Sequence, residues 1–154
     1  MTNKTLTALG VVLALAGVGV ITLNARAGTE MPAYMVDDAE AIALGEQVYA
    51  ENCASCHGTK LEGAPNWRQR GADGLLPAPP HDATGHTWHH DSETLFKITK
   101  YGIAKLIGDP DHRSGMPAYE GVLSDAEIIA VLSFIRESWP DDIKAAYDAR
   151  EAGE

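Results

Sequence analysis

The chain has 154 residues, and its 22 acidic residues outnumber its 12 basic residues, which gives a formal net charge of −10. This charge argues against binding to nucleic acid, whose phosphates attract clusters of Lys and Arg, and against a polybasic membrane-surface patch. The length suits one domain with short extensions, and two cysteines are too few for the disulfide framework of a small secreted domain.

Residues 1–27 have the pattern of an export signal. Lys4 precedes a sixteen-residue run without charge, Ala8–Leu23, and small residues follow at Ala25 and Ala27, as in an A-x-A cleavage site. The run is shorter than the roughly 20 apolar residues that a membrane-spanning helix needs. A cleaved signal peptide is therefore favoured over an N-terminal anchor with membrane contact through residues 8–23. Both interpretations place the rest of the chain in the periplasm.

A linker is expected at residues 28–36, and a helix is predicted directly after it. Asp37 and Glu40 stand three positions apart, as the two polar members of a capping box do. Apolar or small residues then recur at helical spacing. The helix is expected to end near Asn52, which would place Cys53 at its C-terminal end.

The middle of the chain is predicted to be mostly loop. Residues 58–90 contain many glycines and prolines, which interrupt regular structure. Asp91 can cap a short helix that stops at Gly102, and residues 108–121 are again irregular.

A second capping-box pair, Ser124 and Glu127, opens the last predicted helix, which closes before Pro140. Residues 141–154 are expected to be a polar tail with a helical turn or two that fray. Because no alternating strand pattern is present, the fold class is expected to be all-α, with three to five short helices. Loops as long as these are uncommon unless something organises them, and a large buried cofactor would do so.

The sequence Cys53-Ala54-Ser55-Cys56-His57 is a C-x-x-C-H motif, the pattern of c-type haem attachment. Two thiols at this spacing can form thioethers with the vinyl groups on one edge of the porphyrin, and His57 can then supply an axial nitrogen to the iron. The alternatives are weaker: a disulfide closing so small a loop stabilises little, a thioredoxin-like pair needs a βαβ setting, and zinc needs more ligands.

Met116 is the candidate for the second axial ligand. It is the one methionine that follows the motif, and it lies between Gly115 and Pro117 in a segment that separates two predicted helices. A loop of this kind can bend over a porphyrin face. A lone methionine is usually a packing residue, but its thioether can also complete the coordination of a haem iron.

On these residues the chain resembles the class I c-type cytochromes, over about residues 37–140. Residues 45–58 are similar to the N-terminal helix and attachment site of that family. Residues 115–117 are similar to the segment that carries its methionine ligand, and residues 123–139 to its C-terminal helix. The resemblance implies a cytochrome c fold whose helices and long loops wrap around one covalent haem c. It also implies a close crossing of the first and last helices, at Gly45, Tyr49, Val131 and Phe134.

The function that this resemblance implies is that of a single-electron carrier in a periplasmic electron-transfer chain, not an enzyme. His57 and Met116 would be the axial ligands, and redox proteins would serve as electron donor and acceptor. An alternative is a haem enzyme, or a protein that responds to gas or peroxide, in which Met116 leaves the iron.

A second alternative is copper handling by a histidine-rich segment. His81, His86, His89 and His90 fall within ten residues, and imidazole suits copper. A further alternative is that one of them replaces Met116 as an axial ligand. The favoured interpretation is a loop that packs Trp88 and one or two histidines on the haem edge or its propionates, because a flexible loop does not hold metal geometry unaided.

Overall fold

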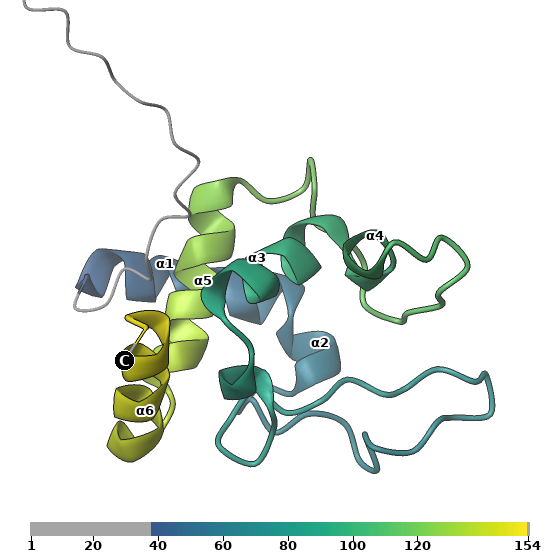
Figure 1. The fold of residues 1–154 in the computed structure, drawn as a ribbon, viewed down its shortest axis with the longest axis horizontal. Coiled ribbons are helices and arrows are strands. Elements are labelled where there is room, and N and C mark those ends of the chain that lie inside the picture. Colours follow the sequence, from purple (N-terminus) through teal and green to yellow (C-terminus); the bar gives the residue numbers. More distant parts are fainter. Residues whose placement is uncertain (1–37, 154) are drawn as a thin grey trace, which may run out of the picture. The chain divides into compact units, whose positions relative to one another are not determined.

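The computed structural model describes residues 38–153, which form helices joined by loops and contain no strand (Figure 1). The elements are α1 (Ala39–Asn52), α2 (Ala54–His57), the 3-10 helix η1 (Thr87–His89), α3 (Ser92–Tyr101), α4 (Ile103–Ile107), α5 (Asp125–Glu137) and α6 (Asp141–Glu151). The all-α class is confirmed. Six α-helices in this part of the chain exceed the expected three to five, because α2 and α4 are too short to give a periodic pattern.

The expectations for residues 1–27, for the linker at 28–36 and for Asp37 lie outside the described residues. Within residues 38–153, no helix combines the length and the apolar character that crossing a membrane requires.

Helix α1 begins one residue later than the sequence pattern suggested, with Asp38 as its N-cap. The Asp38 carboxylate accepts hydrogen bonds from the backbone N–H groups of Glu40 and Ala41, at 3.0 and 3.1 Å. The helix ends at Asn52, and the N–H of Cys53 donates to the last turn. It therefore delivers Cys53 at its end, as predicted.

The predicted ends of the next two long helices are confirmed. Asp91 accepts a 2.7 Å hydrogen bond from the N–H of Thr94 at the start of α3, and α3 stops at Gly102, whose φ of 80° suits a residue without a side chain. Ser124 and Glu127 form both halves of a capping box at the start of α5.

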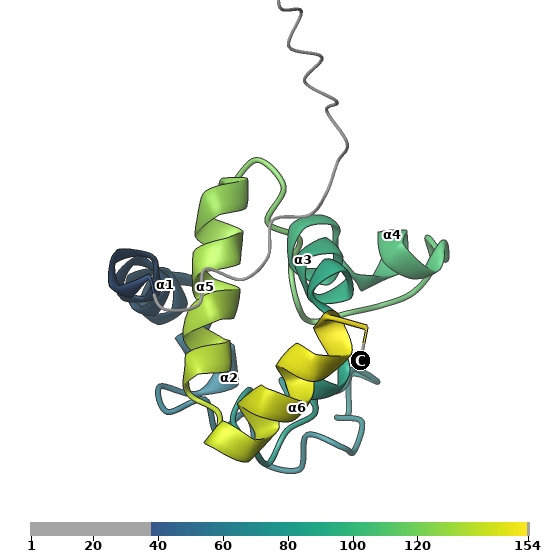
Figure 2. The ribbon, with the colours of Figure 1, turned by 60° about the vertical axis from the view of Figure 1, so that its left-hand side comes forward.

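Helices α1 and α5 cross at close range (Figures 1 and 2). Gly45 of α1 lies against the backbone of Ala130 in α5, where a β-carbon would have no room. Tyr49, one turn further along α1, places its ring 5.6 Å from that of Phe134. This is the crossing that the resemblance to the class I c-type cytochromes implied. Because α2 follows α1 almost directly, the crossing also sets the position of α2.

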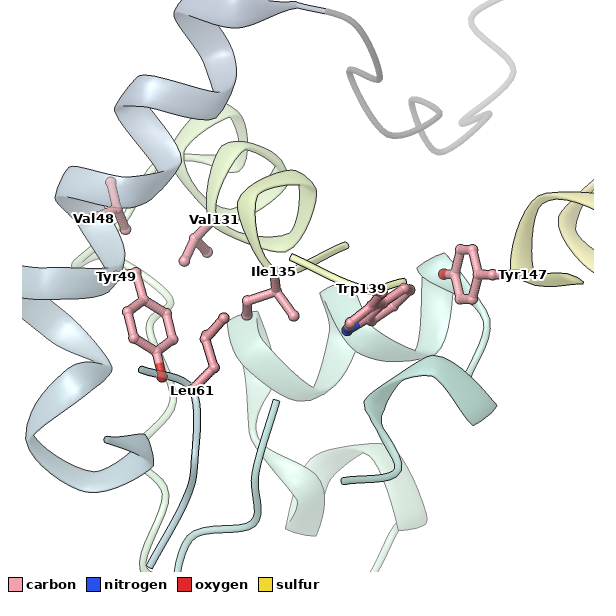
Figure 3. Packing of buried hydrophobic residues seen from close by; sticks show 7 residues of the cluster. All are labelled: Val48, Tyr49, Leu61, Val131, Ile135, Trp139 and Tyr147. Carbon is pink, nitrogen blue, oxygen red and sulfur yellow. The ribbon is translucent and has the colours of Figure 1, made fainter. Parts of the chain in front are cut away.

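The core that supports this crossing extends to the C-terminal helix (Figure 3). Its buried members are Val48, Tyr49, Leu61, Val131, Ile135, Trp139 and Tyr147. Leu61 comes from the loop after α2, so the loop is tied to the helices through apolar contact. Tyr147 comes from α6 and is only 1% exposed.

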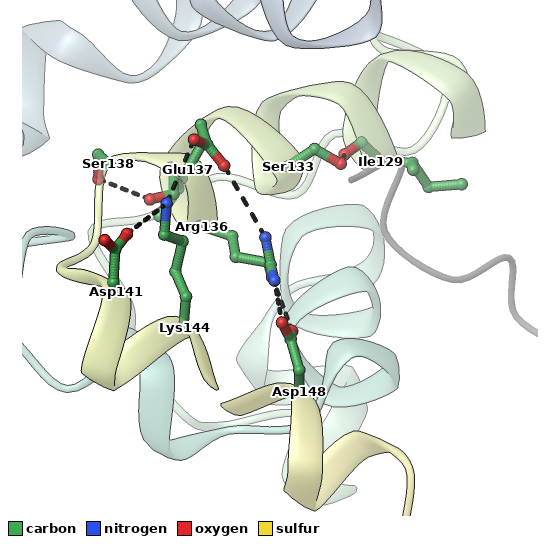
Figure 4. Close-up of polar contacts among 9 residues, drawn as sticks. Ile129, Ser133, Arg136, Glu137, Ser138, Asp141, Lys144 and Asp148 are labelled. Carbon is green, nitrogen blue, oxygen red and sulfur yellow. Dashed lines mark hydrogen bonds and ion pairs between the residues drawn. The ribbon is translucent and has the colours of Figure 1, made fainter. Parts of the chain in front are cut away.

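Helix α6 is an eleven-residue helix and not the short polar tail that the sequence suggested. The Tyr147 ring lies 5.1 Å from that of Trp139. Asp148, one residue on, forms an ion pair with the buried Arg136 of α5 (Figure 4). The polar composition of the segment concealed these contacts, since they depend on one buried aromatic residue and on one carboxylate that pairs with a buried arginine.

Candidate haem-binding site

A cavity of about 680 Å³ lies beside α2, and its wall comes from several parts of the fold. Its wall includes the four residues that the sequence predicts to bind haem, namely Cys53, Cys56, His57 and Met116. Much of the remaining wall is apolar and is contributed by α3 and α5, through Leu95, Ile98, Val131, Leu132 and Ile135. The volume lies in the range of cavities that bind small molecules and cofactors.

The single turn of α2 places the motif residues on the cavity wall. The N–H groups of Cys56 and His57 both donate to the carbonyl of Cys53, at 3.1 and 2.9 Å. No disulfide joins the two cysteines, of which Cys53 is half-buried and Cys56 is exposed. Burial, with a smaller effect of Cys56, raises the pKa of Cys53 to about 11, so this thiol stays protonated at neutral pH.

The His57 ring is held by one hydrogen bond from the facing loop. Its Nδ1 lies 2.8 Å from the carbonyl oxygen of Pro79. Because a carbonyl oxygen can only accept, Nδ1 carries the proton, and the neutral ring keeps a free lone pair on Nε2. Burial lowers the pKa of His57, and the bond to Pro79 opposes that change in part. The arrangement is that of a metal-ligating histidine with its second nitrogen anchored.

Met116 lies on the cavity wall in the methionine loop, which we define as residues 108–119. Its N–H donates to the Ser114 hydroxyl at 3.1 Å. At the end of the loop, Tyr119 donates from its N–H to the carbonyl of Thr99 in α3 and from its hydroxyl to the carbonyl of Asn52, at 3.0 and 2.7 Å. Tyr119 thus ties the methionine loop to the end of α1.

Sequence reasoning missed Tyr119 as a residue of the site. The available signal was an aromatic residue three positions after the candidate ligand. Nothing in that spacing identified the carbonyl of Asn52 as its partner, because the two residues meet only in the folded chain.

The four histidines of the histidine loop, residues 81–90, have different surroundings. His81, His86 and His90 lie on the cavity wall, whereas His89 stacks on Trp88, with ring centroids 3.7 Å apart. Within residues 38–153, no group of three or more His, Cys, Asp or Glu side chains is placed to hold a metal ion. In this part of the chain, the copper alternative therefore finds no ligand set of three or more side chains.

His81 is the most enclosed of these histidines. Its ring stacks on that of His57, with centroids 4.0 Å apart and an interplanar angle of 27°. Burial, together with the nearby His57 and His86, lowers the pKa of His81 to about 3. The ring is therefore uncharged at neutral pH.

A family model described as cytochrome c oxidase, cbb3-type, subunit III matches residues 40–135 of the chain. The chain belongs to this family of c-type cytochromes. The matched residues include the C-x-x-C-H motif, the methionine loop and all but the last two residues of α5. Helix α6 of this cytochrome lies beyond the match.

Curated relatives of this cytochrome are subunits of cbb3-type cytochrome c oxidases. It is 32% identical over 110 residues to the subunit FixP of Bradyrhizobium sp. (strain ORS 278), which covers 70% of this chain and 33% of the relative. It is also 32% identical over 116 residues to the subunit CcoP of Azospirillum sp. (strain B510), over 75% of this chain and 32% of the relative. The chain thus spans about a third of the length of these relatives. No solved structure matches it.

Membership of this family makes the domain a haem c electron-transfer component, and the described residues fit that group. The cavity offers two thiols at the sequence spacing of the C-x-x-C-H motif, an imidazole with a free lone pair, and a thioether. The rest of its wall is largely apolar, as burial of a porphyrin requires.

Proposed function

We propose that this cytochrome is a single-electron carrier with one haem c bound covalently through Cys53 and Cys56. His57 and Met116 are its axial ligands. The observation that carries the proposal is that these four side chains line one cavity with a largely apolar wall, although η1, α3, α4 and long loops separate Met116 from the other three in sequence. A bound haem c supplies a reversible one-electron change at its iron and no bond chemistry on a substrate.

Each of these side chains has one task. The two thiols fix one edge of the group to the turn at the end of α1. His57 presents Nε2 as a neutral donor, because the Pro79 carbonyl holds its proton on Nδ1. Met116 supplies a soft, neutral sulfur, which favours the reduced iron and raises the potential relative to a second histidine.

The apolar wall has two consequences for electron transfer. Side chains such as Val131, Leu132 and Ile135 keep water from the group, and a low-polarity surrounding disfavours the more highly charged ferric state. With His57 and Met116 both holding the iron, an external ligand would have no open site. The domain is therefore a carrier and not itself a catalyst.

The partners we propose are redox proteins that deliver and accept one electron. The relatives of this cytochrome are subunits of cbb3-type oxidases. We therefore propose an oxidase of that kind as its electron acceptor or as the complex to which it belongs. The proposed location is the periplasm, with the N-terminal segment either removed as a signal or kept as an anchor through residues 8–23. Intact mass of the exported protein separates these two forms, since the cleaved form lacks residues 1–27.

The ferric absorption spectrum of the haem-loaded protein tests the ligand set. Sulfur ligation gives a weak band near the red end of this spectrum, and Met116→Ala should abolish that band. The same variant should have a lower reduction potential, and its reduced form should newly bind carbon monoxide. Leu76→Ala is the matched control, because Leu76 also lines the cavity but is half exposed and offers no ligand atom. If Met116→Ala keeps the band and excludes carbon monoxide, the His/Met assignment is wrong.

A further inference from the structure

His81 is positioned against the ring of His57 and is used by no step of the proposed function. The two imidazoles stack at 4.0 Å with an interplanar angle of 27°, and both lie on the cavity wall. The Pro79 carbonyl that anchors His57 comes from the same stretch of chain, two residues before His81. One short segment therefore touches the candidate axial ligand twice.

The position of His81 is fixed from three directions. Its ring Nδ1 is hydrogen-bonded to the hydroxyl of the buried Thr87, with 2.8 Å between the nitrogen and the oxygen. Its carbonyl accepts a 2.8 Å hydrogen bond from the indole Nε1 of Trp139, which follows α5. Its N–H donates to the carbonyl of Leu61 at 2.8 Å. Two of these bonds fix the backbone of His81 and one holds its ring, against which the Tyr49 ring also packs edge-on, with centroids 6.3 Å apart.

One hydrogen bond alone does not fix the plane of a histidine ring. The bond from His57 Nδ1 to Pro79 restrains the ring, but hydrogen bonds tolerate a broad range of angles, so the ring plane can still rock about its mean position. A flat, fixed ring at stacking distance removes that freedom, because rotation of His57 would drive its edge into His81. The stack therefore supplies the restraint that the hydrogen bond lacks.

We propose that His81 is a positioning residue that sets the plane of the His57 ring. This inference rests on the proposed function, in which His57 is an axial ligand of haem c. Surrounding groups that orient a ligating histidine tune the metal. In the ferric protein the plane of an axial imidazole governs how unpaired spin spreads over the porphyrin, which is read from the haem methyl shifts in NMR and the g values in electron paramagnetic resonance.

The test compares substitutions of His81 in the haem-loaded ferric protein. His81→Leu removes the flat ring and is expected to redistribute the haem methyl shifts and move the g values. His81→Phe keeps a flat ring and is expected to restore most of the wild-type pattern. Thr87→Val frees His81 from one anchor and is expected to shift the pattern in the same direction as His81→Leu, by less. His89→Leu is the matched control, because His89 stacks on Trp88 and not on His57.

The result that overturns the inference is a His81→Leu protein with the methyl shifts and g values of wild type. If His81→Leu does not retain haem, the Thr87→Val protein decides: a changed pattern supports the inference, and an unchanged one overturns it. Covalently bound haem and the weak band near the red end of the ferric spectrum, which reports sulfur ligation, are measured in the wild type and in every variant. Their absence from the wild-type protein would instead refute the proposed function, so the two failures are distinguishable.

Discussion

Gly45 of α1 meets the carbonyl group of Ala130 in α5 so closely that an ideal β-carbon at position 45 would lie 2.1 Å from the Ala130 oxygen. The same carbon would lie 2.8 Å from the β-carbon of Phe134. Neither obstacle can swing aside, because one is backbone and the other is fixed to it. The absence of a side chain at Gly45 therefore sets the distance between the two helices that carry the core.

Gly45→Ala is expected to lower the free energy of unfolding by a net amount of about 2 kcal/mol, because a contact this close belongs at the upper end of the usual overpacking cost of about 1–3 kcal/mol. The intrinsic helix preference of Ala over Gly, about 1 kcal/mol, opposes this loss but does not cancel it. Urea denaturation of the haem-loaded protein measures the difference. Glu46→Ala, at the next and exposed position of α1, is the control; a Gly45→Ala protein as stable as this control would contradict the crossing.

Asp148→Ala is expected to destabilise the protein by about 1–3 kcal/mol. The change removes the two hydrogen bonds of Asp148 to the guanidinium of Arg136, which is 3% exposed, and leaves it only the more distant carboxylate of Glu137 at 3.9 Å (Figure 4). Removing one partner of a fully buried pair costs about 3–5 kcal/mol, and the half-exposed side chain of Asp148 reduces that figure. Thermal or urea unfolding checks it, with Glu46→Ala again as control. A loss no greater than that of the control would show that α6 is not held by this pair.

The stability of the protein is expected to fall in acid in part through Glu127. The Ser124 hydroxyl and N–H both donate to its carboxylate at 2.7 Å and lower the pKa of Glu127 from its usual 4.5. Because the folded-state pKa is below the unfolded-state value, this stabilisation is complete above the unfolded pKa and is lost as the pH falls through the folded pKa.

Unfolding of wild type and Glu127→Ala at neutral pH and at about pH 3 measures this contribution. The stability difference between the two proteins should be larger at neutral pH than at about pH 3. An equal difference at both values would mean that the carboxylate form of Glu127 does not matter to the cap.

Tyr119→Phe is expected to loosen the methionine loop. The change removes the hydrogen bond from the Tyr119 hydroxyl to the carbonyl of Asn52, which is worth about 1 kcal/mol. Because this bond ties the loop to the end of α1, carbon monoxide should bind the reduced haem-loaded protein faster than it binds wild type. Tyr101→Phe makes the same chemical change at a partly exposed position of α3. Equal binding rates in the two variants would contradict a role for Tyr119 in holding the loop.

Features that depend on a few neighbouring residues could be predicted from the sequence. The caps of α3 and α5 involve side chains and backbone N–H groups three positions apart, as at Asp91 and Thr94. The crossing at Gly45 was expected from the resemblance to the class I c-type cytochromes. It also has a physical reason in the sequence, because a glycine on the apolar face of a helix usually marks a close packing contact. The C-x-x-C-H motif carries its chemistry in five consecutive residues.

Features that depend on contacts between distant segments could not be predicted in the same way. Helix α6 owes its place to Tyr147 against Trp139 and to Asp148 beside Arg136, and composition alone describes it as a polar tail. The stack of His81 on His57 is set by the path of a loop rich in proline and glycine. The sequence placed four histidines together but did not distinguish the one that contacts the candidate ligand.

The mass of the intact, denatured polypeptide tests the central claim most directly, after production in a host equipped to mature c-type cytochromes. Covalent attachment through Cys53 and Cys56 predicts the mass of the mature chain plus one haem, retained under denaturing conditions, and the mass of the bare chain for the double variant Cys53→Ala/Cys56→Ala. A wild-type mass equal to that of the bare chain, with both thiols free to react with an alkylating reagent, would contradict the claim.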